Sequence, residues 1–165
     1  MAWPGCLVER AMPKRTAPVQ DAHFDAFRLA REHGTLEGQV DLNDLPRLAE
    51  WLADEPEDGD APLAWRITGG EDAQRRPALS IRLEGVVPLV CQRCLGPLPW
   101  PVAQRTEILL ARSDAEMAQL DADSGSEVIV AAAPLDPAVL VEDELLLTVP
   151  YAPRHAEACS PPAGT

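Results

Sequence analysis

The sequence predicts a single α+β domain: an antiparallel β-sheet or a partly open barrel with three to four short helices. Several segments of the 165-residue chain alternate apolar and polar residues with the period of two that β-strands show. Short segments with helix caps lie between them. Seventeen prolines and ten glycines interrupt the chain often enough to exclude a bundle of long helices. Apolar residues make up 46% of the chain, enough to fill the core of one domain.

The charge balance disfavours nucleic acid as the main binding partner. Fourteen Lys and Arg stand against 27 Asp and Glu, a formal net charge of −13. A surface this acidic repels a phosphate backbone at long range, so its bulk is poorly suited to non-specific nucleic-acid binding. No segment approaches the roughly 20 apolar residues of a membrane span. The N-terminus lacks the apolar segment of a secretory signal. We therefore expect a cytoplasmic protein without a membrane partner.

The chain divides into an arm, a domain and a tail. Residues 1–20, with three prolines and a small basic cluster, are expected to form a flexible N-terminal arm. Met12 opens MPKRTAPVQ, which is more typical of a bacterial start than Met1, so residues 1–11 are hypothesised to precede the native start. Residues 21–159 form the α+β domain. Residues 160–165 have the composition of a disordered tail.

The first half of the domain alternates helices and strands. Asp21 can cap a helix over 21–33, which Gly34 would end. The spacing then predicts a strand over 35–42, a short helix over 45–52 and a strand over 61–70. Residues 54–60 hold five acids and no base, so they are expected to form a solvated loop or a docking patch for a basic partner.

The second half centres on a β-hairpin. Residues 78–110 alternate on both sides of a turn at Cys91 to Gly96, so the sequence places Cys91 and Cys94 at the tip. Beyond it we expect a helix over 115–120, a flexible loop over 121–126 and a strand over 127–132. Asp136 and Pro137 then begin a helix that runs to about Thr148.

The cysteines carry the most suggestive chemistry. Cys91 and Cys94 are three positions apart on a tight turn, so both thiolates can face one metal ion. A tetrahedral zinc needs two more ligands. His155 and Cys159, spaced i, i+4, complete a three-cysteine, one-histidine set. One structural zinc is the cofactor that this pattern suggests. The alternative is that Cys91 and Cys94 are small, partly buried residues at a turn.

A redox role for the cysteine pair is disfavoured by its surroundings. A thioredoxin-like pair opens a helix whose dipole lowers the thiol pKa. Here Pro97 and Pro99 follow at once. The sequence also lacks a Gly-rich phosphate loop, a nucleophile elbow and a zinc-protease motif. We therefore expect neither an enzyme nor a small-molecule substrate.

Three consecutive acids, Glu142, Asp143 and Glu144, interrupt the last predicted helix. Neighbours on a helix are about 100° apart, so these acids cannot share one ligand face. The sequence favours a solvated helix face, with a recognition surface for a basic partner as the alternative. Arg93 is the basic residue between Cys91 and Cys94.

Two motifs together resemble a known family. LVCQRCL at residues 89–95 and LVEDELLL at 140–147, followed by Pro153, His155 and Cys159, are similar to the bacterial YceD family of large ribosomal RNA subunit accumulation proteins. The stretch from Gly38 to Leu48 is also similar, so the resemblance covers roughly residues 20–160.

The resemblance implies a non-enzymatic role in the synthesis, processing or stability of 23S ribosomal RNA, and so in large-subunit assembly. An acidic protein suits a basic ribosomal protein or assembly factor better than naked RNA. We therefore expect a protein partner, contacted at Glu142, Asp143, Glu144 and Arg93, with any direct contact to 23S RNA kept local. The alternatives are a zinc-binding interaction module without a ribosomal role, and a thiol oxidoreductase.

Overall fold

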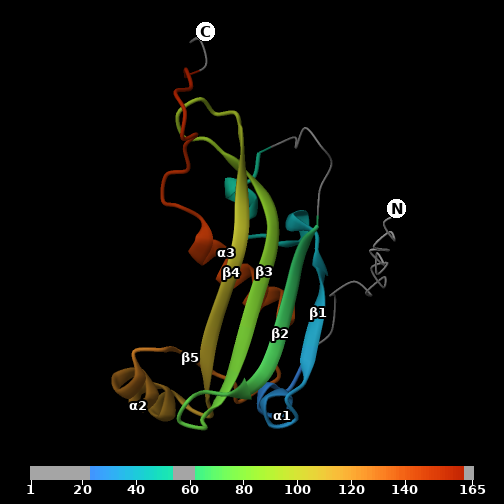
Figure 1. The fold of residues 1–165 in the computed structure, drawn as a ribbon, viewed down its shortest axis with the longest axis vertical. Helices are drawn as coiled ribbons and strands as arrows, with labels where there is room; N and C mark the ends of the chain where they lie inside the picture. The colour runs from blue at the N-terminus through green and yellow to red at the C-terminus, as the bar shows by residue number, and fades with distance from the viewer. Residues whose placement is uncertain (1–22, 54–61, 162–165) are drawn as a thin grey trace, which may run out of the picture.

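One open sheet organises the chain (Figure 1). The computed structural model describes residues 23–53 and 62–161. Within these ranges five strands lie in the order β1-β2-β3-β4-β5, so β1 and β5 are the edges and the sheet does not close. Three α-helices accompany it, which confirms the α+β class. The elements are α1 (Ala26–Arg31), β1 (Thr35–Val40), β2 (Leu63–Glu71), β3 (Pro77–Val90), β4 (Pro97–Ala111), α2 (Asp114–Ser124), β5 (Glu127–Val130) and α3 (Pro137–Thr148).

The strand directions differ from expectation at one edge. Strands β1 to β4 form the expected antiparallel meander. β5 instead pairs parallel to β4, with Ile108 opposite Glu127. The reason is the connection: α2 carries the chain back before β5 begins, as a crossover between parallel strands requires.

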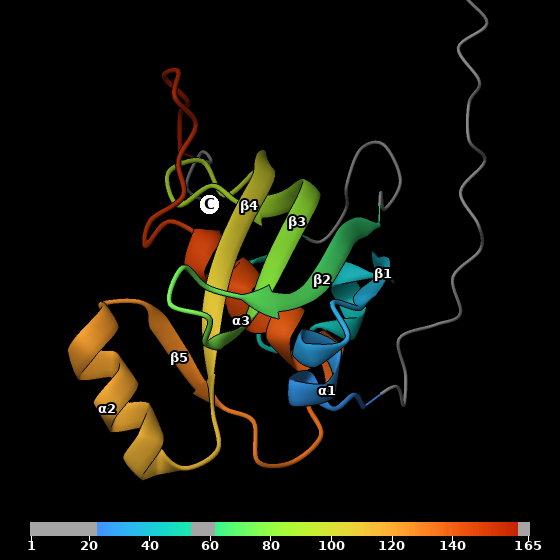
Figure 2. The same cartoon turned by 60° about the horizontal axis from the view of Figure 1, so that its bottom comes forward.

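The core lies between the sheet and α3, which runs behind β3 and β4 (Figure 2). The inward residues of β3 alternate, as its sequence predicts: Leu79, Ile81, Leu83, Val87 and Leu89 are buried. α3 contributes Leu140, Val141 and Leu145. Each such side chain contributes about 1.5–3 kcal/mol when fully buried. The opposite face of the sheet is polar, with arginines Arg66, Arg82 and Arg105 in adjacent strands paired to glutamates.

The first helix begins later than the sequence predicts. Asp25, not Asp21, caps α1 by accepting a hydrogen bond from the Arg28 N–H. Phe24 is excluded from the helix because its N–H and carbonyl pair with Leu135 at 2.9 Å in both directions. Asp21 lies outside the described residues.

Two other local predictions are corrected. Residues 45–52 do not form one helix; short 3₁₀ turns occur at Leu42–Asp44 and Ala49–Trp51. The Leu48 N–H reaches the Leu45 carbonyl, the i to i−3 pattern of such a turn. The loop expected over 121–126 is helical as far as Ser124, where Gly125 ends α2 with φ of 60°. The cap at Asp136 with Pro137 behind it is confirmed.

Several expectations fall outside the described residues. They are the flexible arm over 1–20, the acidic segment 54–60 and the end of the tail at 162–165. Among the helices in the described ranges, none has the length and apolar character needed to cross a membrane.

Candidate metal centre

The β3–β4 turn presents the cysteine pair as the sequence predicts. The Cys91 N–H donates to the Gly96 carbonyl and the Leu95 N–H donates to the Cys91 carbonyl, both at 2.9 Å. Leu95 adopts a positive φ of 59°, which a branched residue rarely does. The tight turn imposes this conformation and directs both thiols to one side of the tip.

The chain after α3 returns to the same tip. Figure 1 shows this C-terminal segment running upward beside the end of the β3–β4 hairpin. The Gln92 N–H donates to the Pro153 carbonyl at 2.8 Å. His155 Nε2 lies 3.0 Å from the Pro97 carbonyl. These two contacts bring His155 and Cys159 to the cysteine pair.

The four predicted ligands meet in one cluster. The ligand atoms of Cys91, Cys94, His155 and Cys159 all lie within 4.8 Å of one another. The Sγ atoms of Cys91 and Cys159 are 3.8 Å apart, and Cys94 Sγ is 3.5 Å from His155 Nδ1. In a zinc tetrahedron with bonds of about 2.3 Å to sulfur and 2.0–2.1 Å to nitrogen, those edges are about 3.8 Å and 3.5 Å. Two of the six distances between ligand atoms therefore match a zinc site, and the four atoms lie close enough together to surround one ion.

The histidine is held in the tautomer that a metal requires. A carbonyl oxygen only accepts, so the contact with Pro97 makes Nε2 the protonated nitrogen. Nδ1 then carries the lone pair and faces Cys94. A backbone carbonyl that orients a ligating imidazole in this way is common around zinc.

The thiols of Cys91 and Cys159 differ in pKa. Burial raises the pKa of Cys91, but the backbone N–H groups of Cys94, Arg93 and His155 and the Cys94 thiol outweigh it and lower that pKa to about 5. Burial raises the pKa of Cys159, and the neighbouring thiols of Cys94 and Cys91 raise it further. Cys91, Cys94 and Cys159 are all free thiols. A cation bound here would therefore favour the thiolate of Cys91 and lower the pKa of Cys159.

The acids of α3 do not form the solvated face that the sequence favours. Glu142 and Glu144 are buried, with 4% and 2% of their surface exposed, and only Asp143 is exposed. Glu142 accepts hydrogen bonds from the Arg47 N–H at 2.6 Å and from Arg47 Nε at 2.8 Å. Asp143 Oδ1 lies 2.6 Å from Nη1 of the same arginine. As a set they are therefore not a free docking surface.

Arg47 is the partner of Glu142 and Asp143 that the sequence analysis missed. It belongs to the Leu-Pro-Arg-Leu stretch that carries the weaker part of the family resemblance, and that stretch was the available signal. Arg93 lies at the tip as predicted, exposed, with Nη1 3.5 Å from the Glu157 carbonyl. Glu144 has an unpartnered Oε2 atom, and burial raises its pKa, although a hydrogen bond from Thr106 offsets part of the effect.

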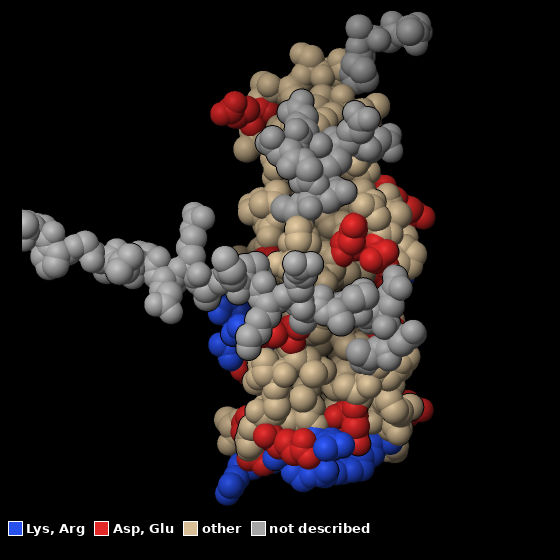
Figure 3. Space-filling view, turned by 90° about the vertical axis from the view of Figure 1, so that its right-hand side faces the viewer, with Lys and Arg blue, Asp and Glu red and all other residues tan. Residues whose placement is uncertain are grey.

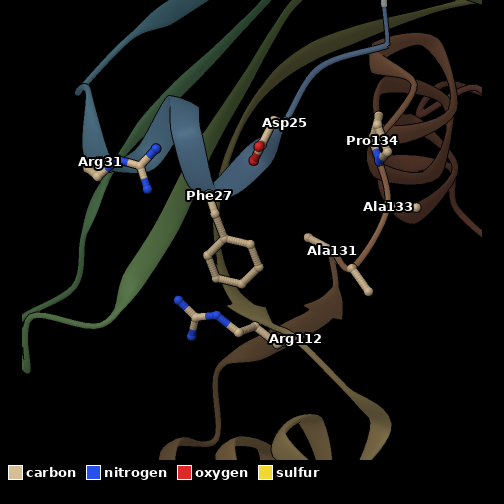
Figure 4. Close-up of a pocket in the computed structure, with 8 residues that line it drawn as sticks. Asp25, Phe27, Arg31, Arg112, Ala131, Ala133 and Pro134 are labelled. Carbon is tan, nitrogen blue, oxygen red and sulfur yellow. The ribbon is translucent and has the colours of Figure 1, made fainter.

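A second feature lies at the opposite end, near α1. A hollow of about 440 Å³ is lined by Asp25, Phe27, Arg31, Arg112 and residues 131–134 (Figure 4). The Arg112 guanidinium lies over the Phe27 ring at 4.5 Å and also pairs with Glu116. Basic side chains gather at this lower end with acidic ones beside them (Figure 3). Because most of these charges already have partners, we assign no ligand to the hollow.

The comparison with protein families agrees with the geometry of the tip. A model of the family described as large ribosomal RNA subunit accumulation protein YceD matches residues 79–165, more than half of the chain. The chain belongs to the YceD family. The YceD match contains all four residues of the metal cluster and the acids of α3, but not Arg47. No curated protein and no solved structure matches the chain.

Proposed function

We propose that this YceD protein supports the accumulation of 23S ribosomal RNA as a non-catalytic assembly factor whose hairpin tip is locked by one structural zinc. The observation that carries the proposal is the Cys91, Cys94, His155 and Cys159 cluster, in which two of the six distances between ligand atoms match a zinc tetrahedron. The metal would join the β3–β4 turn to a segment 60 residues further along the chain and make one rigid tip.

The surroundings of the cysteines support a structural role over a redox one. Cys91 and Cys94 lie on the turn between β3 and β4, and β4 begins at Pro97. They therefore lack the helix N-terminus that activates a thiol in a dithiol oxidoreductase. His155 faces them as a ligand donor with its other nitrogen already engaged.

We propose that the acidic body engages a basic ribosomal protein or assembly factor. The formal charge of −13 favours such a partner over naked RNA. Because Glu142 and Glu144 are buried, most of the acids available for contact lie elsewhere. α2 carries three exposed ones, Asp114, Asp121 and Asp123, and also Glu116, which pairs with Arg112; it has no basic residue of its own. It packs mainly against the sheet edge formed by β4 and β5 and stands away from the remaining strands (Figure 2).

Two measurements test the proposal together. Protein purified without a chelator or metal-binding tag is expected to hold about one zinc per chain, and Cys91→Ser and His155→Ala are each expected to lose it. Cys6→Ser is the matched control and is expected to retain it. Wild-type protein is also expected to co-sediment with precursors of the large subunit.

The outcomes separate the alternatives. A well-folded wild type without zinc would refute the metal lock. Zinc binding without co-sedimentation would favour an interaction module with no ribosomal role. Disulfide-reductase activity that disappears in Cys94→Ser would instead favour the oxidoreductase.

A further inference from the structure

We propose that the hairpin tip is also a contact site for unpaired nucleotides of ribosomal RNA, with Tyr151 as a stacking platform and Arg93 and Arg154 as phosphate ligands. The inference rests on the ribosomal role proposed above and adds to it the place where RNA touches the protein. It concerns only a few nucleotides, because the rest of the molecule is acidic.

Tyr151 is the most exposed large hydrophobic side chain among the described residues. It is the single tyrosine of the chain, and 96% of its surface is exposed. An aromatic ring usually buries much of its area or places its hydroxyl on a partner, and this one does neither. It lies between the end of α3 and Pro153, whose carbonyl holds Gln92 of the tip. Its ring is therefore presented to solvent in the segment that connects α3 to the tip.

The same place holds two arginines without a carboxylate partner. Most arginines of the described ranges form ion pairs; those without one are Arg31, Arg93 and Arg154. Arg93 and Arg154 both belong to the segments that meet at the tip. Their backbones are adjacent because the residues just before them, Gln92 and Pro153, share a 2.8 Å hydrogen bond. Two exposed arginines therefore directly follow the residues that join the two segments.

The charges around the tip are unlike those of the body. Arg93 is the single charged residue from position 85 to 104, and Arg154 is the single Asp, Glu, Lys or Arg from 145 to 156. The nearest acid along the chain is Glu157. Three thiolates with one Zn²⁺ would sum to −1, so the two arginines would offset the charges of the cluster and of Glu157. Local repulsion of a phosphate group at the two guanidinium groups is therefore small.

These side chains suit single-stranded RNA better than a duplex or a basic protein. Unpaired bases stack on aromatic rings, and guanidinium forks bind phosphate oxygens. Base pairing hides the faces that Tyr151 would use. A basic protein would be repelled by Arg93 and Arg154. The expected contact is weak, because two phosphate contacts and one stacked base supply it.

The test uses the zinc-loaded, full-length protein and a fluorescently labelled single-stranded RNA of about 12 nucleotides at low salt. Wild type is expected to bind with a salt slope of about −1.4, from two phosphate contacts on a single strand. Tyr151→Ala is expected to weaken binding about tenfold, whereas Tyr151→Phe retains it because the ring remains. Arg154→Gln is expected to reduce the salt slope by about 0.7.

Arg31→Gln is the matched control. Arg31 is exposed and without an ion pair among the described residues, as Arg154 is, but it lies at the α1 end. It is expected to bind RNA like the wild type. Zinc content measured on each variant shows whether the tip is intact.

Three results would overturn the inference: no binding by the wild type at low salt, unchanged binding by Tyr151→Ala, or equal losses in Arg31→Gln and Arg154→Gln. Failure here is distinguishable from failure of the proposed function. If zinc-loaded protein co-sediments with large-subunit precursors but does not bind the oligonucleotide, the ribosomal role stands and the RNA contact is refuted. The tip would then be a contact site for a protein. If the wild-type protein does not co-sediment with large-subunit precursors, the ribosomal role itself is refuted.

Discussion

Glu142 illustrates how one side chain joins distant parts of this chain. Its carboxylate receives the backbone N–H of Arg47 and, at 3.3 Å, that of Leu48, together with the Arg47 guanidinium. The acceptor lies on α3 and the donors in the connection between β1 and β2. A buried charge is tolerated when several hydrogen bonds satisfy it, and that condition is met here.

Glu142→Ala is expected to lower the free energy of unfolding by about 2–3 kcal/mol, because buried N–H donors lose a charged acceptor. Asp143→Ala is the matched control on the next residue. Its carboxylate is half exposed, so the expected loss is below about 1 kcal/mol. Urea unfolding of both variants measures the difference. Equal losses would show that burial of Glu142 contributes nothing.

Glu144 is expected to make stability depend on pH. Burial raises its pKa above the ordinary value of 4.5, so the native state holds the proton more tightly than the unfolded state does. Stability therefore falls as pH rises from about 4.5 through the raised pKa. Glu144→Gln is expected to be more stable than the wild type above that window, with the gain shrinking as the pH falls.

Chemical denaturation at pH 8 and pH 5 checks this prediction. Glu107→Gln is a suitable control, because that side chain on β4 is 70% exposed. A Glu144→Gln protein that is less stable than the wild type at pH 8 would show that its carboxylate has partners beyond those described.

At the scale of elements, the contact between α1 and β2 depends on a missing side chain. A Cβ atom added to Gly69 would lie 2.2 Å from the Leu29 carbonyl oxygen and 2.3 Å from its carbon. The obstacle is helix backbone, which cannot rotate away as a flexible side chain can. α1 therefore lies as close to β2 as it does because residue 69 is glycine.

Gly69→Ala is expected to destabilise the protein by about 1–3 kcal/mol, since α1 must shift outward. Gly70→Ala provides the control, because its added Cβ would meet nothing nearer than His33 Nδ1 at 4.0 Å. Thermal unfolding of the two variants compares neighbouring positions of one strand. The prediction is wrong if both lose the same amount.

At the scale of the whole molecule, the metal cluster and the core occupy different ends. The cluster lies beyond the ends of β1 and β2, at the tip of the long hairpin (Figure 1). The buried residues of the core lie between α3 and the sheet. The hairpin is held in the sheet by its pairing with β2, so a metal bound at the cluster would hold the tip and not the sheet.

Removal of metal by a chelator is therefore expected to release the tip and leave the sheet intact. Hydrogen exchange is expected to speed up at Gln92, whose N–H is bonded to Pro153, and to stay slow at Ile81 in β3. Uniformly faster exchange across the sheet would show instead that the metal is required for the whole fold.

The local features of this protein could be predicted from its sequence. Alternation in β3 and β4 identifies the hairpin, and Asp136 followed by Pro137 identifies the start of α3. The spacing within each of the two ligand pairs identifies the candidate metal residues. These features involve residues within a few positions of one another, where periodicity and capping hydrogen bonds leave a visible pattern.

Other features depended on contacts between distant segments. The pairing of Phe24 with Leu135 delays α1, and the Arg47 donors draw Glu142 into the core. The crossover through α2 makes β5 parallel, and the meeting of residues 91–96 with 153–159 assembles four ligands from two pairs. Spacing along a chain records which residues share a local face. Which of those faces meet, and which charges are thereby buried, is settled only when the packed core brings segments together.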